Sequence, residues 1–338
     1  MILKDGAHIH LIAACGTAMG SLAIMLKERG FRITGSDKHV YPPMSTYLED
    51  AGIELTEGFS ASNISHDTDL VIVGNAVSRG NPELEATLDA HIPYSNMPEV
   101  LRDYFISGLN SVVISGTHGK TTTTAITAHL FNYAGLDPSF LIAGIPNNFN
   151  HSHRLGKGEH FIIEGDEYDS AYFAKWSKFF YYLPQTLIIN NIEFDHADIF
   201  NDLKQILRSF HQLVNTVPKS GLIIANTDDN SVKEVIKSSH SPIQTSGLES
   251  DAYCIDGFCR EINECGICNK TLLTDSYEDL DVGSKLINQY DYRDCYGVCF
   301  NDSGGFGAYT EDTCGDCVGG NTGHHDGWYE SDPQYGTV

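Results

Sequence analysis

A short stretch near the middle of the chain constrains the fold more than any other feature. A β-branched run at residues 111–116 leads into Gly-Thr-His-Gly-Lys-Thr-Thr, and a helical pattern continues over residues 121–133. A glycine-rich turn with a lysine between a strand and a helix is the context of a phosphate-binding loop, because main-chain N–H groups and the helix N-terminus face the anion. We therefore predict a nucleotide-binding α/β domain around this loop.

The residues of this loop have separate predicted roles. Main-chain N–H groups would hold the phosphates of ATP, Lys120 would reach the β and γ oxygens, and the Thr121 hydroxyl would bind Mg²⁺. Ile114 stands where the longer G-x-x-x-x-G-K-T form begins with glycine, so only the shorter loop is present. The predicted ATP-binding residues are Gly116, Thr117, His118, Gly119, Lys120, Thr121 and Thr122.

Strand and helix patterns alternate along the first hundred residues. Residues 8–13 read as a buried strand, a glycine-containing turn follows, and a helical run ends at Gly30. Further strands are predicted at residues 31–37 and near residue 70. This order predicts a parallel sheet of the Rossmann type, and we place the first domain at residues 1–107.

The second predicted domain, residues 108–244, is a partial P-loop α/β domain that binds ATP. After the phosphate-binding loop, strands are predicted at residues 160–166, 185–192 and 221–228, with a helix at residues 202–214. The regular pattern is expected to stop after Asn230.

The last quarter of the chain, residues 245–338, has a different composition. From Glu249 onward it holds 18 Asp and Glu against 4 Lys and Arg. Before residue 250 the sequence has one cysteine, Cys15, whereas eight further cysteines lie between residues 254 and 317. Their irregular spacing, without histidine at ligand distance, favours disulfides over zinc. We predict an irregular tail, disordered or stapled by disulfides, of a kind that by itself suggests a secreted protein.

Charge and hydropathy exclude two classes of partner. The formal net charge of -24 argues against nucleic acid, whose binders need a basic surface to displace counterions. No run approaches the roughly 18 apolar residues of a membrane span, and the start has no basic segment ahead of an apolar one. We predict a cytoplasmic protein without nucleic-acid or membrane partners, and the sequence leaves its oligomeric state open.

Three motifs in order carry a resemblance to a known family. The loop GTHGKTT is followed by IIEGDEYDSAYF and then by NNIEFDHADIF. This order resembles that of the Mur ligases that act on UDP-N-acetylmuramate. Within that family, the segments SDKHVYPPMSTYLEDAGIEL, GNAVSRGNPELE, LIAGIPNNF and IEFDHADIF are most similar to the members that recycle murein peptides. The resemblance extends from His8 to about Asp229 and is lost by His240.

The resemblance implies an ATP-dependent amide-bond ligase. In the family, ATP phosphorylates the muramyl carboxylate, and the amine of the incoming peptide attacks the acyl phosphate to leave ADP and phosphate. The implied substrates are UDP-N-acetylmuramate and the murein tripeptide L-Ala-γ-D-Glu-meso-diaminopimelate, and the implied cofactors are ATP and Mg²⁺. The nearest competing activity joins L-alanine to UDP-N-acetylmuramate.

Acidic residues after a predicted strand are candidate metal ligands, because ligands bind at the carboxyl ends of strands in open α/β sheets. The cluster consists of Glu164, Asp166, Glu167 and Asp169. The resemblance implies that Thr121, Glu164 and His196 bind Mg²⁺. It also implies that Lys120 neutralises charge on the transferred phosphoryl group, while His118 and Asn191 orient the carboxylate or a metal-bound oxygen.

The turn after the first strand is a candidate UDP-sugar site. Its residues ACGTAMG lack the G-x-G-x-x-G spacing, so dinucleotide binding is a minor interpretation. The resemblance implies that this turn holds the sugar diphosphate at a helix N-terminus. Cys15 is interpreted as a small buried residue. The predicted UDP-sugar residues are Gly16, Thr17, Ala18, Met19, Ser36, Asp37, Asn75 and Ser78, with Arg79 and Asn81 beside them.

The chain departs from the family pattern on its C-terminal side. The sequence contains neither the late G-x-H-N segment of the central domain nor a third, peptide-binding domain, so we expect incomplete adenine recognition and an exposed sheet edge. We favour a truncated ligase followed by an unrelated sequence. Two other interpretations are a non-catalytic protein that binds nucleotide or UDP-sugar, and an extracellular disulfide or calcium-binding module in the tail.

Overall fold

The computed structural model describes residues 3–195, 200 and 202–247, together with the backbone of a few short strands further on. Residues 1–246 form one compact unit and residues 247–338 a second. In the second unit β15 (Tyr253–Ile255) pairs with β16 (Phe258–Arg260), and β17 (Thr310–Glu311) pairs with β18 (Cys317–Val318). The disulfides and the zinc alternative considered for the tail concern side chains outside the described residues.

The first sheet is parallel throughout and has the order β3-β2-β1-β4-β5. Strands β1 and β4 are buried along their whole length, which explains their continuous apolar runs. The elements are β1 His8–Ile12, α1 Thr17–Glu28, β2 Arg32–Asp37, α2 Met44–Asp50, β3 Glu54–Glu57, η1 Ala61–Asn63, β4 Leu70–Val73, α3 Pro82–Asp89, β5 Tyr94–Asn96, α4 Met97–Leu101 and the π-helical η2 Arg102–Ile106.

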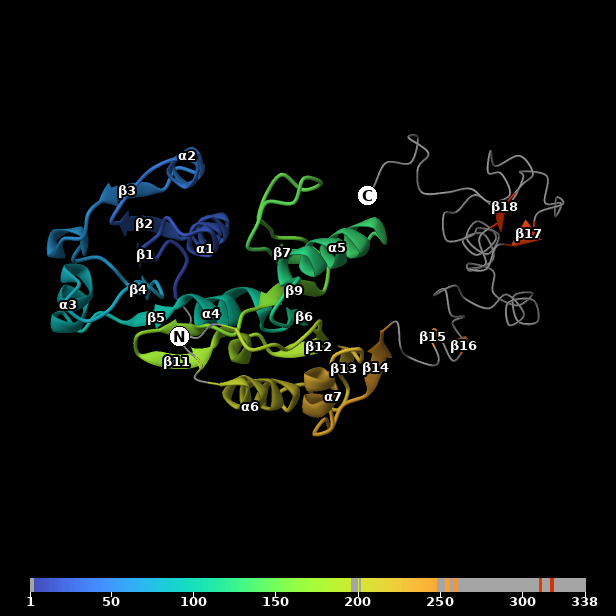
Figure 1. The fold of residues 1–338 in the computed structure, drawn as a ribbon. Coiled ribbons are helices and arrows are strands. Elements are labelled where there is room, and N and C mark those ends of the chain that lie inside the picture. The colour runs from blue at the N-terminus through green and yellow to red at the C-terminus, as the bar shows by residue number, and fades with distance from the viewer. Residues whose placement is uncertain are drawn as a thin grey trace. The chain divides into compact units, whose positions relative to one another are not determined.

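The second sheet has the order β14-β13-β12-β6-β9-β7-β8, with only the two-residue β8 antiparallel to its neighbour. Helix α5 covers one face, and α6 and α7 cover the other (Figure 1). The elements are β6 Asn110–Ser115, α5 Lys120–Tyr133, β7 Ser139–Leu141, β8 His153–Arg154, β9 His160–Gly165, β10 Asp169–Ala171, β11 Ala174–Ser177, η3 Lys178–Tyr181, β12 Pro184–Ile189, α6 Leu203–Val214, β13 Leu222–Asn226, α7 Asn230–Ile236 and β14 Ile243–Ser246.

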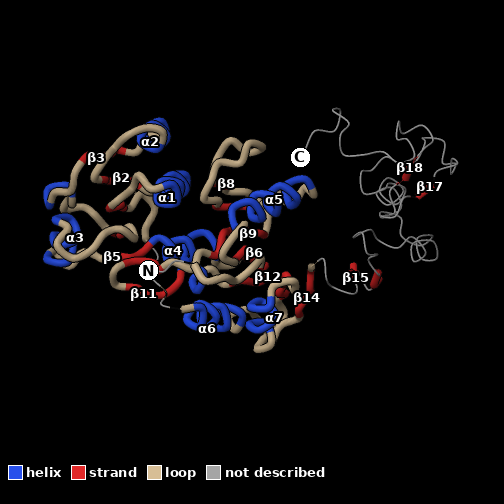
Figure 2. Tube along the Cα trace, viewed as in Figure 1, coloured by secondary structure: helices blue, strands red, loops and turns tan. Residues whose placement is uncertain are grey.

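These two sheets confirm the fold class, a Rossmann-like sheet followed by a P-loop α/β sheet. Figure 2 shows helices alternating with strands through both. The expectation that regular structure stops after Asn230 is wrong, because α7 and β14 continue the second sheet. Asp229 makes this possible, since its Oδ1 caps the N–H groups of Ser231 and Val232. The apolar pattern of this short helix is too brief to be recognised in the sequence.

Strand β14 forms the last edge of the second sheet in the described part of the chain. Three of its four residues are exposed, and Ile243 is among the exposed large apolar residues. The second sheet therefore ends in an exposed edge strand, as predicted. That strand is β14, whereas the last strand predicted from the sequence was at residues 221–228.

One hydrophobic core connects the two sheets. A single cluster of buried residues includes Leu22 and Leu26 of α1 and Leu101 of α4. It also includes Phe179 of η3 and Phe210 of α6, which pack with the second sheet. The Ser21 hydroxyl also lies 2.7 Å from that of Ser152. Helix α1 of the first sheet therefore lies against the segment that leads into β8. Among the described helices, none is both long and apolar enough to cross a membrane.

Candidate active site

The phosphate-binding loop connects β6 to α5 as predicted. Gly116 has φ 136°, and a Cβ there would lie 2.9 Å from the main-chain oxygen of Asn191. Gly119, the residue before α5, has φ 78°. Both conformations favour glycine, which lets the loop close against Asn191 and start the helix at Lys120. The first turn of α5 then presents main-chain N–H groups at the helix end, as an anion site requires.

Gly116→Ala is expected to lower the free energy of unfolding by about 1–3 kcal/mol and to weaken ATP binding about tenfold, since the added methyl both strains the backbone and displaces Asn191. Denaturant unfolding and calorimetric ATP titration measure the two effects. Gly58→Ala is the matched control, because Gly58 also has positive φ but nothing lies near its Cβ position. Equal losses of ATP affinity in both variants would contradict this role of Gly116.

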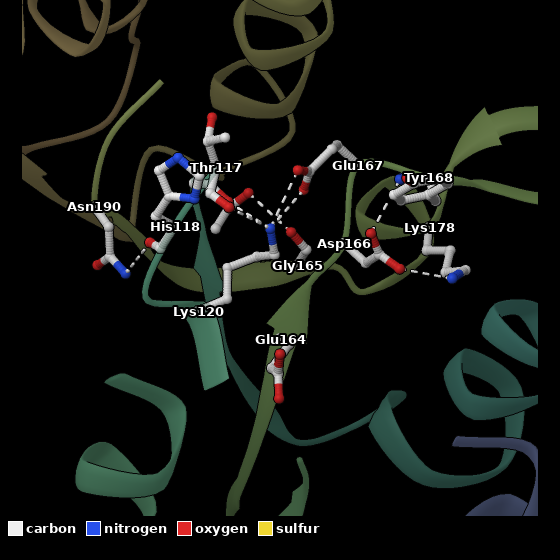
Figure 3. A network of polar contacts seen from close by, with 12 residues as sticks. Thr117, His118, Lys120, Glu164, Gly165, Asp166, Glu167, Tyr168, Lys178 and Asn190 are labelled. Carbon is white, nitrogen blue, oxygen red and sulfur yellow. Dashed lines mark hydrogen bonds and ion pairs between the residues drawn. The ribbon is translucent and has the colours of Figure 1, made fainter. Parts of the chain in front are cut away.

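Lys120 is folded back over the loop that carries it. Its Nζ donates to the main-chain oxygens of Gly116 (2.7 Å) and Thr117 (3.1 Å) and lies 3.0 Å from Glu167 Oε2. Glu167 is 3% exposed, so this ion pair is shielded from solvent. Figure 3 shows the ammonium group between the loop and the Glu167 carboxylate. Lys120 is thus held at the loop with a carboxylate as its counterion.

Thr121 and Glu164, two of the predicted metal ligands, are in contact. The Thr121 hydroxyl donates to Glu164 Oε2 (2.9 Å), and the N–H of Ala143 donates to Oε1 (2.6 Å). Burial raises the pKa of the Glu164 carboxyl, while the bonds from Ala143 and Thr121 and the charge of Lys120 oppose that shift. His196, the third predicted ligand, lies outside the described residues.

A hydroxyl and a carboxylate suit Mg²⁺, which prefers oxygen donors. Two protein ligands are sufficient, because Mg²⁺ usually keeps several waters and also binds substrate phosphates. Within the described part of the chain, no group of three or more His, Cys, Asp and Glu side chains is arranged to hold a metal. The fit to Mg²⁺ therefore rests on Thr121 and Glu164.

The predicted catalytic residues His118 and Asn191 lie against each other. The N–H of His118 donates to Asn191 Oδ1 (2.8 Å), and the N–H of Thr117 donates to the Asn191 main-chain oxygen (2.9 Å). The His118 ring is exposed and faces Glu193 across 3.7 Å. Asn191 thus braces the loop from the end of β12. Thr122, also predicted to bind ATP, is exposed on the first turn of α5.

A cavity of about 300 Å³ joins the phosphate-binding loop to helix α1. Its polar wall carries Lys120, Glu164 and the phenol of Tyr182. Burial, together with nearby Asp166 and Glu164, raises the pKa of Tyr182 well above its usual value, which keeps this buried phenol neutral. The remaining lining residues are Ala18, Met97, Leu141, Ile142, Ala143, Ile163, Asp166, Tyr168 and Lys178. Charged groups on an apolar background are typical of a ligand site.

The turn predicted to hold the UDP-sugar diphosphate reaches this cavity through one residue. Gly16 precedes α1 and is exposed, as is Thr17, whereas Ala18 lines the cavity. Met19 is buried and packs in the core. Asp37 fixes the turn, because its Oδ2 accepts from the N–H of Cys15 (2.8 Å).

Cys15 is a partly buried free thiol. Burial, with Asp37 and Glu49 nearby, raises its pKa to about 11, so the thiol stays protonated at neutral pH. This agrees with its interpretation as a small packing residue.

The other predicted UDP-sugar residues have different surroundings. Ser36 is fully buried and its hydroxyl donates to Glu83, so its side chain belongs to an internal network. Asn75 and Ser78 are exposed on the segment after β4. The neighbouring Arg79 forms a two-bond ion pair with Glu85, and Asn81 caps α3. The UDP-sugar assignments stay predictions.

The structure adds residues that sequence reasoning did not select. Lys178 and Tyr182 line the cavity although no motif contains them, and Ala143 of the segment LIAGIPNNF lines it although no role was predicted for it. Asn190 supports the loop, because its Nδ2 donates to Thr123 Oγ1 (3.1 Å) and to the main-chain oxygen of His118 (3.3 Å). The Asn-Asn pair at the end of β12 was a usable signal for Asn190.

The two sheets and the loop define an α/β protein of the P-loop type. Comparison with protein families assigns it more narrowly. The model described as "Mur ligase family, catalytic domain" matches residues 8–106, and the one described as "Mur ligase middle domain" matches residues 114–286. The chain belongs to the Mur ligase family.

Individual relatives are similar over about two thirds of the chain. UDP-N-acetylmuramate–L-alanyl-γ-D-glutamyl-meso-2,6-diaminoheptandioate ligase of Haemophilus influenzae is 48% identical over 229 residues, which are 68% of this chain and 51% of that protein. The Escherichia coli enzyme of the same name is 49% identical over 228 residues, 68% of this chain and 50% of its own. This chain thus spans about half the length of these curated relatives.

A solved structure agrees with the sequence relatives. The crystal structure of UDP-N-acetylmuramate:L-alanyl-γ-D-glutamyl-meso-diaminopimelate ligase from Neisseria meningitides superposes with a TM-score of 0.68 at 44% identity. The match covers 70% of this chain and 77% of that one.

Proposed function

We propose that this chain carries the nucleotide and UDP-sugar sites of a cytoplasmic ATP-dependent ligase that joins UDP-N-acetylmuramate to L-Ala-γ-D-Glu-meso-diaminopimelate, as in peptidoglycan recycling. One observation carries the proposal: a single cavity is lined by Lys120, by Glu164 and by Ala18 of the α1 turn. A phosphoryl donor at the loop and an acid bound at α1 would therefore meet in one enclosure. The names of the relatives support the choice of substrates.

Several side chains in and beside the cavity have a role in this reaction. Lys120 exchanges Glu167 for the β and γ phosphate oxygens and stabilises the charge on the transferred phosphoryl group. Thr121 and Glu164 would hold Mg²⁺, which would neutralise phosphate charge. The muramyl carboxylate attacks the γ phosphorus, ADP leaves, and the peptide amine then displaces phosphate from the acyl phosphate. The apolar wall, with Leu141 and Ile163, limits water near that intermediate.

Phosphate release by the purified chain tests this proposal. With ATP, Mg²⁺ and UDP-N-acetylmuramate present, release is expected only when the tripeptide is added. Release that depends on L-alanine instead would assign the chain to the competing activity. Nucleotide binding without release under either condition would support the non-catalytic binding protein.

Glu164→Gln is expected to raise the Mg²⁺ concentration needed for half-maximal ATP binding about tenfold or more, because a neutral amide is a weaker Mg²⁺ ligand than a carboxylate. The measurement is ATP titration at a series of Mg²⁺ concentrations. Asp169→Asn is the matched control, since Asp169 follows on the same segment but pairs with the exposed Lys175. A Mg²⁺ dependence unchanged by Glu164→Gln would remove Glu164 from the metal site.

A further inference from the structure

Two lysines share the cavity, and each is neutralised by a different acid of the segment after β9. Lys120 pairs with Glu167 and belongs to the phosphate-binding loop. Lys178 pairs with Asp166 at 2.6 Å and belongs to no recognised motif. The Lys178 side chain is 17% exposed and lines the cavity. A second, largely desolvated ammonium group in a site for anionic substrates calls for a role of its own.

The position of Lys178 is fixed by the backbone. The β10–β11 hairpin returns the chain to the end of β9. There the main-chain N–H of Lys178 donates to the main-chain oxygen of Tyr168 (2.9 Å), and the main-chain N–H of Phe179 donates to the main-chain oxygen of Asp166 (3.3 Å). Asp166 uses its two carboxylate oxygens differently, because Oδ1 accepts from the N–H of Tyr168 (3.1 Å) and Oδ2 accepts from Lys178. The turn therefore keeps three hydrogen bonds when Lys178 releases Oδ2.

The ammonium group of Lys178 retains donor capacity. It has three N–H hydrogens, and Asp166 is the acceptor found for them among the described residues. Figure 3 shows the Lys178 side chain pointing to Asp166 and apart from the group that Lys120 forms with Thr117 and Glu167. In the proposed function the phosphates bind at the group around Lys120, to the loop and the N-terminus of α5. Because Lys120 and the loop already account for the phosphates, Lys178 is available for another anionic group of the substrates, such as a carboxylate.

We propose that Lys178 binds the carboxylate of the acid substrate, exchanging Asp166 for that carboxylate when the substrate enters from the α1 side of the cavity. This inference rests on the proposed function, because it takes UDP-N-acetylmuramate as the ligand. Asp166 serves as a temporary counterion that holds the Lys178 side chain in place until the substrate enters. Its own charge then opposes the incoming carboxylate at short range.

Variants of the two partners give opposite expectations, which separates substrate binding from a structural ion pair. Lys178→Met keeps the aliphatic stem and is expected to raise the Kd for UDP-N-acetylmuramate about tenfold or more, the usual effect of losing a charge-assisted hydrogen bond. Asp166→Asn keeps an oxygen for Tyr168 and is expected to lower that Kd, since it frees Lys178 and removes a like charge. Lys178→Arg is expected to retain most of the affinity.

Calorimetric titration of the full chain with UDP-N-acetylmuramate, and separately with ATP, measures these constants without requiring turnover. Lys175→Met is the matched control, because Lys175 forms an exposed ion pair with Asp169 on the same hairpin, and its Kd values are expected to equal those of the wild type. Melting temperatures identify any variant that fails to fold, in which case Lys178→Arg and Asp166→Asn carry the test.

The possible outcomes are distinct. Equal weakening by Lys178→Met and Asp166→Asn would mean that the pair is only structural, and weakening of ATP binding alone would mean that Lys178 serves a phosphate; either overturns the inference. Wild-type affinity in Lys178→Met would also overturn it while leaving the proposed function intact. A wild-type chain that binds no UDP-N-acetylmuramate would overturn both.

Discussion

Lys120→Met is expected to lower ATP-dependent phosphate release by about 10³-fold, the usual loss when one preorganised charge donor to a transition state is removed. The same change should lower the free energy of unfolding by about 3–5 kcal/mol, because the 3% exposed Glu167 loses its ammonium partner. Single-turnover phosphate assays and denaturant unfolding measure the two effects.

A double variant separates the two consequences of losing Lys120. Lys120→Met combined with Glu167→Gln removes the buried charge as well, so most of the stability should return while phosphate release stays low. Recovery of both properties would show that Lys120 acts only by neutralising Glu167. Lys175→Met is again the control, because it removes a lysine from a nearby exposed pair.

Glu83→Leu is expected to lower the free energy of unfolding by about 3–5 kcal/mol, although Glu83 lies outside the cavity. Glu83 is fully buried in the first domain, where it accepts from Ser36 and from Asn63 Nδ2 (2.6 Å) and lies 3.4 Å from His10 Nε2. Leucine would leave these buried polar groups without their common acceptor. Glu85→Ala on the same helix removes a partly exposed carboxylate, and its effect on the free energy of unfolding should be much smaller.

The Glu83 network also gives a pH dependence. Burial alone would raise the pKa of Glu83, but the bonds from His10, Ser36 and Asn63 together lower it below the ordinary value of 4.5. The stabilising contribution is therefore complete above pH 4.5 and is lost as the pH falls through the lower, folded-state pKa. Acid unfolding curves should show this loss in the wild type and not in Glu83→Gln. Parallel curves for the two proteins would contradict the assignment.

Local patterns in the sequence predicted the parts of the site that follow directly from parallel strands. The contact between Thr121 and Glu164 was predictable because β6 and β9 end at the same edge of one sheet. Ser36 was misleading for the opposite reason, since a strand-end serine has the same sequence signal whether it faces a cleft or Glu83. Lys178 reaches the cavity only because a hairpin folds back, and this contact leaves no spacing rule in the sequence.

The sequence pattern also failed to predict α7 and β14, the part of the second sheet's domain that follows Asn230. Helix α7 has only seven residues, and its burial depends on packing against α6 and β13. Asp229 caps this helix with one carboxylate oxygen, and its other oxygen accepts from the N–H of Ile192 (2.8 Å), next to Asn191. This tertiary hydrogen bond holds the capping residue in place. Tertiary contacts of this kind override weak local propensity.

The hydrophobic core shared by the two sheets has a consequence for how ligands act on the whole unit. Because Leu22, Leu101 and Phe179 belong to one buried cluster, the two domains cannot expose their apolar faces independently. They should denature as one cooperative unit, so that a ligand bound at the loop would also stabilise the first sheet by mass action. A ligand that binds to either sheet would therefore raise the free energy of unfolding of both.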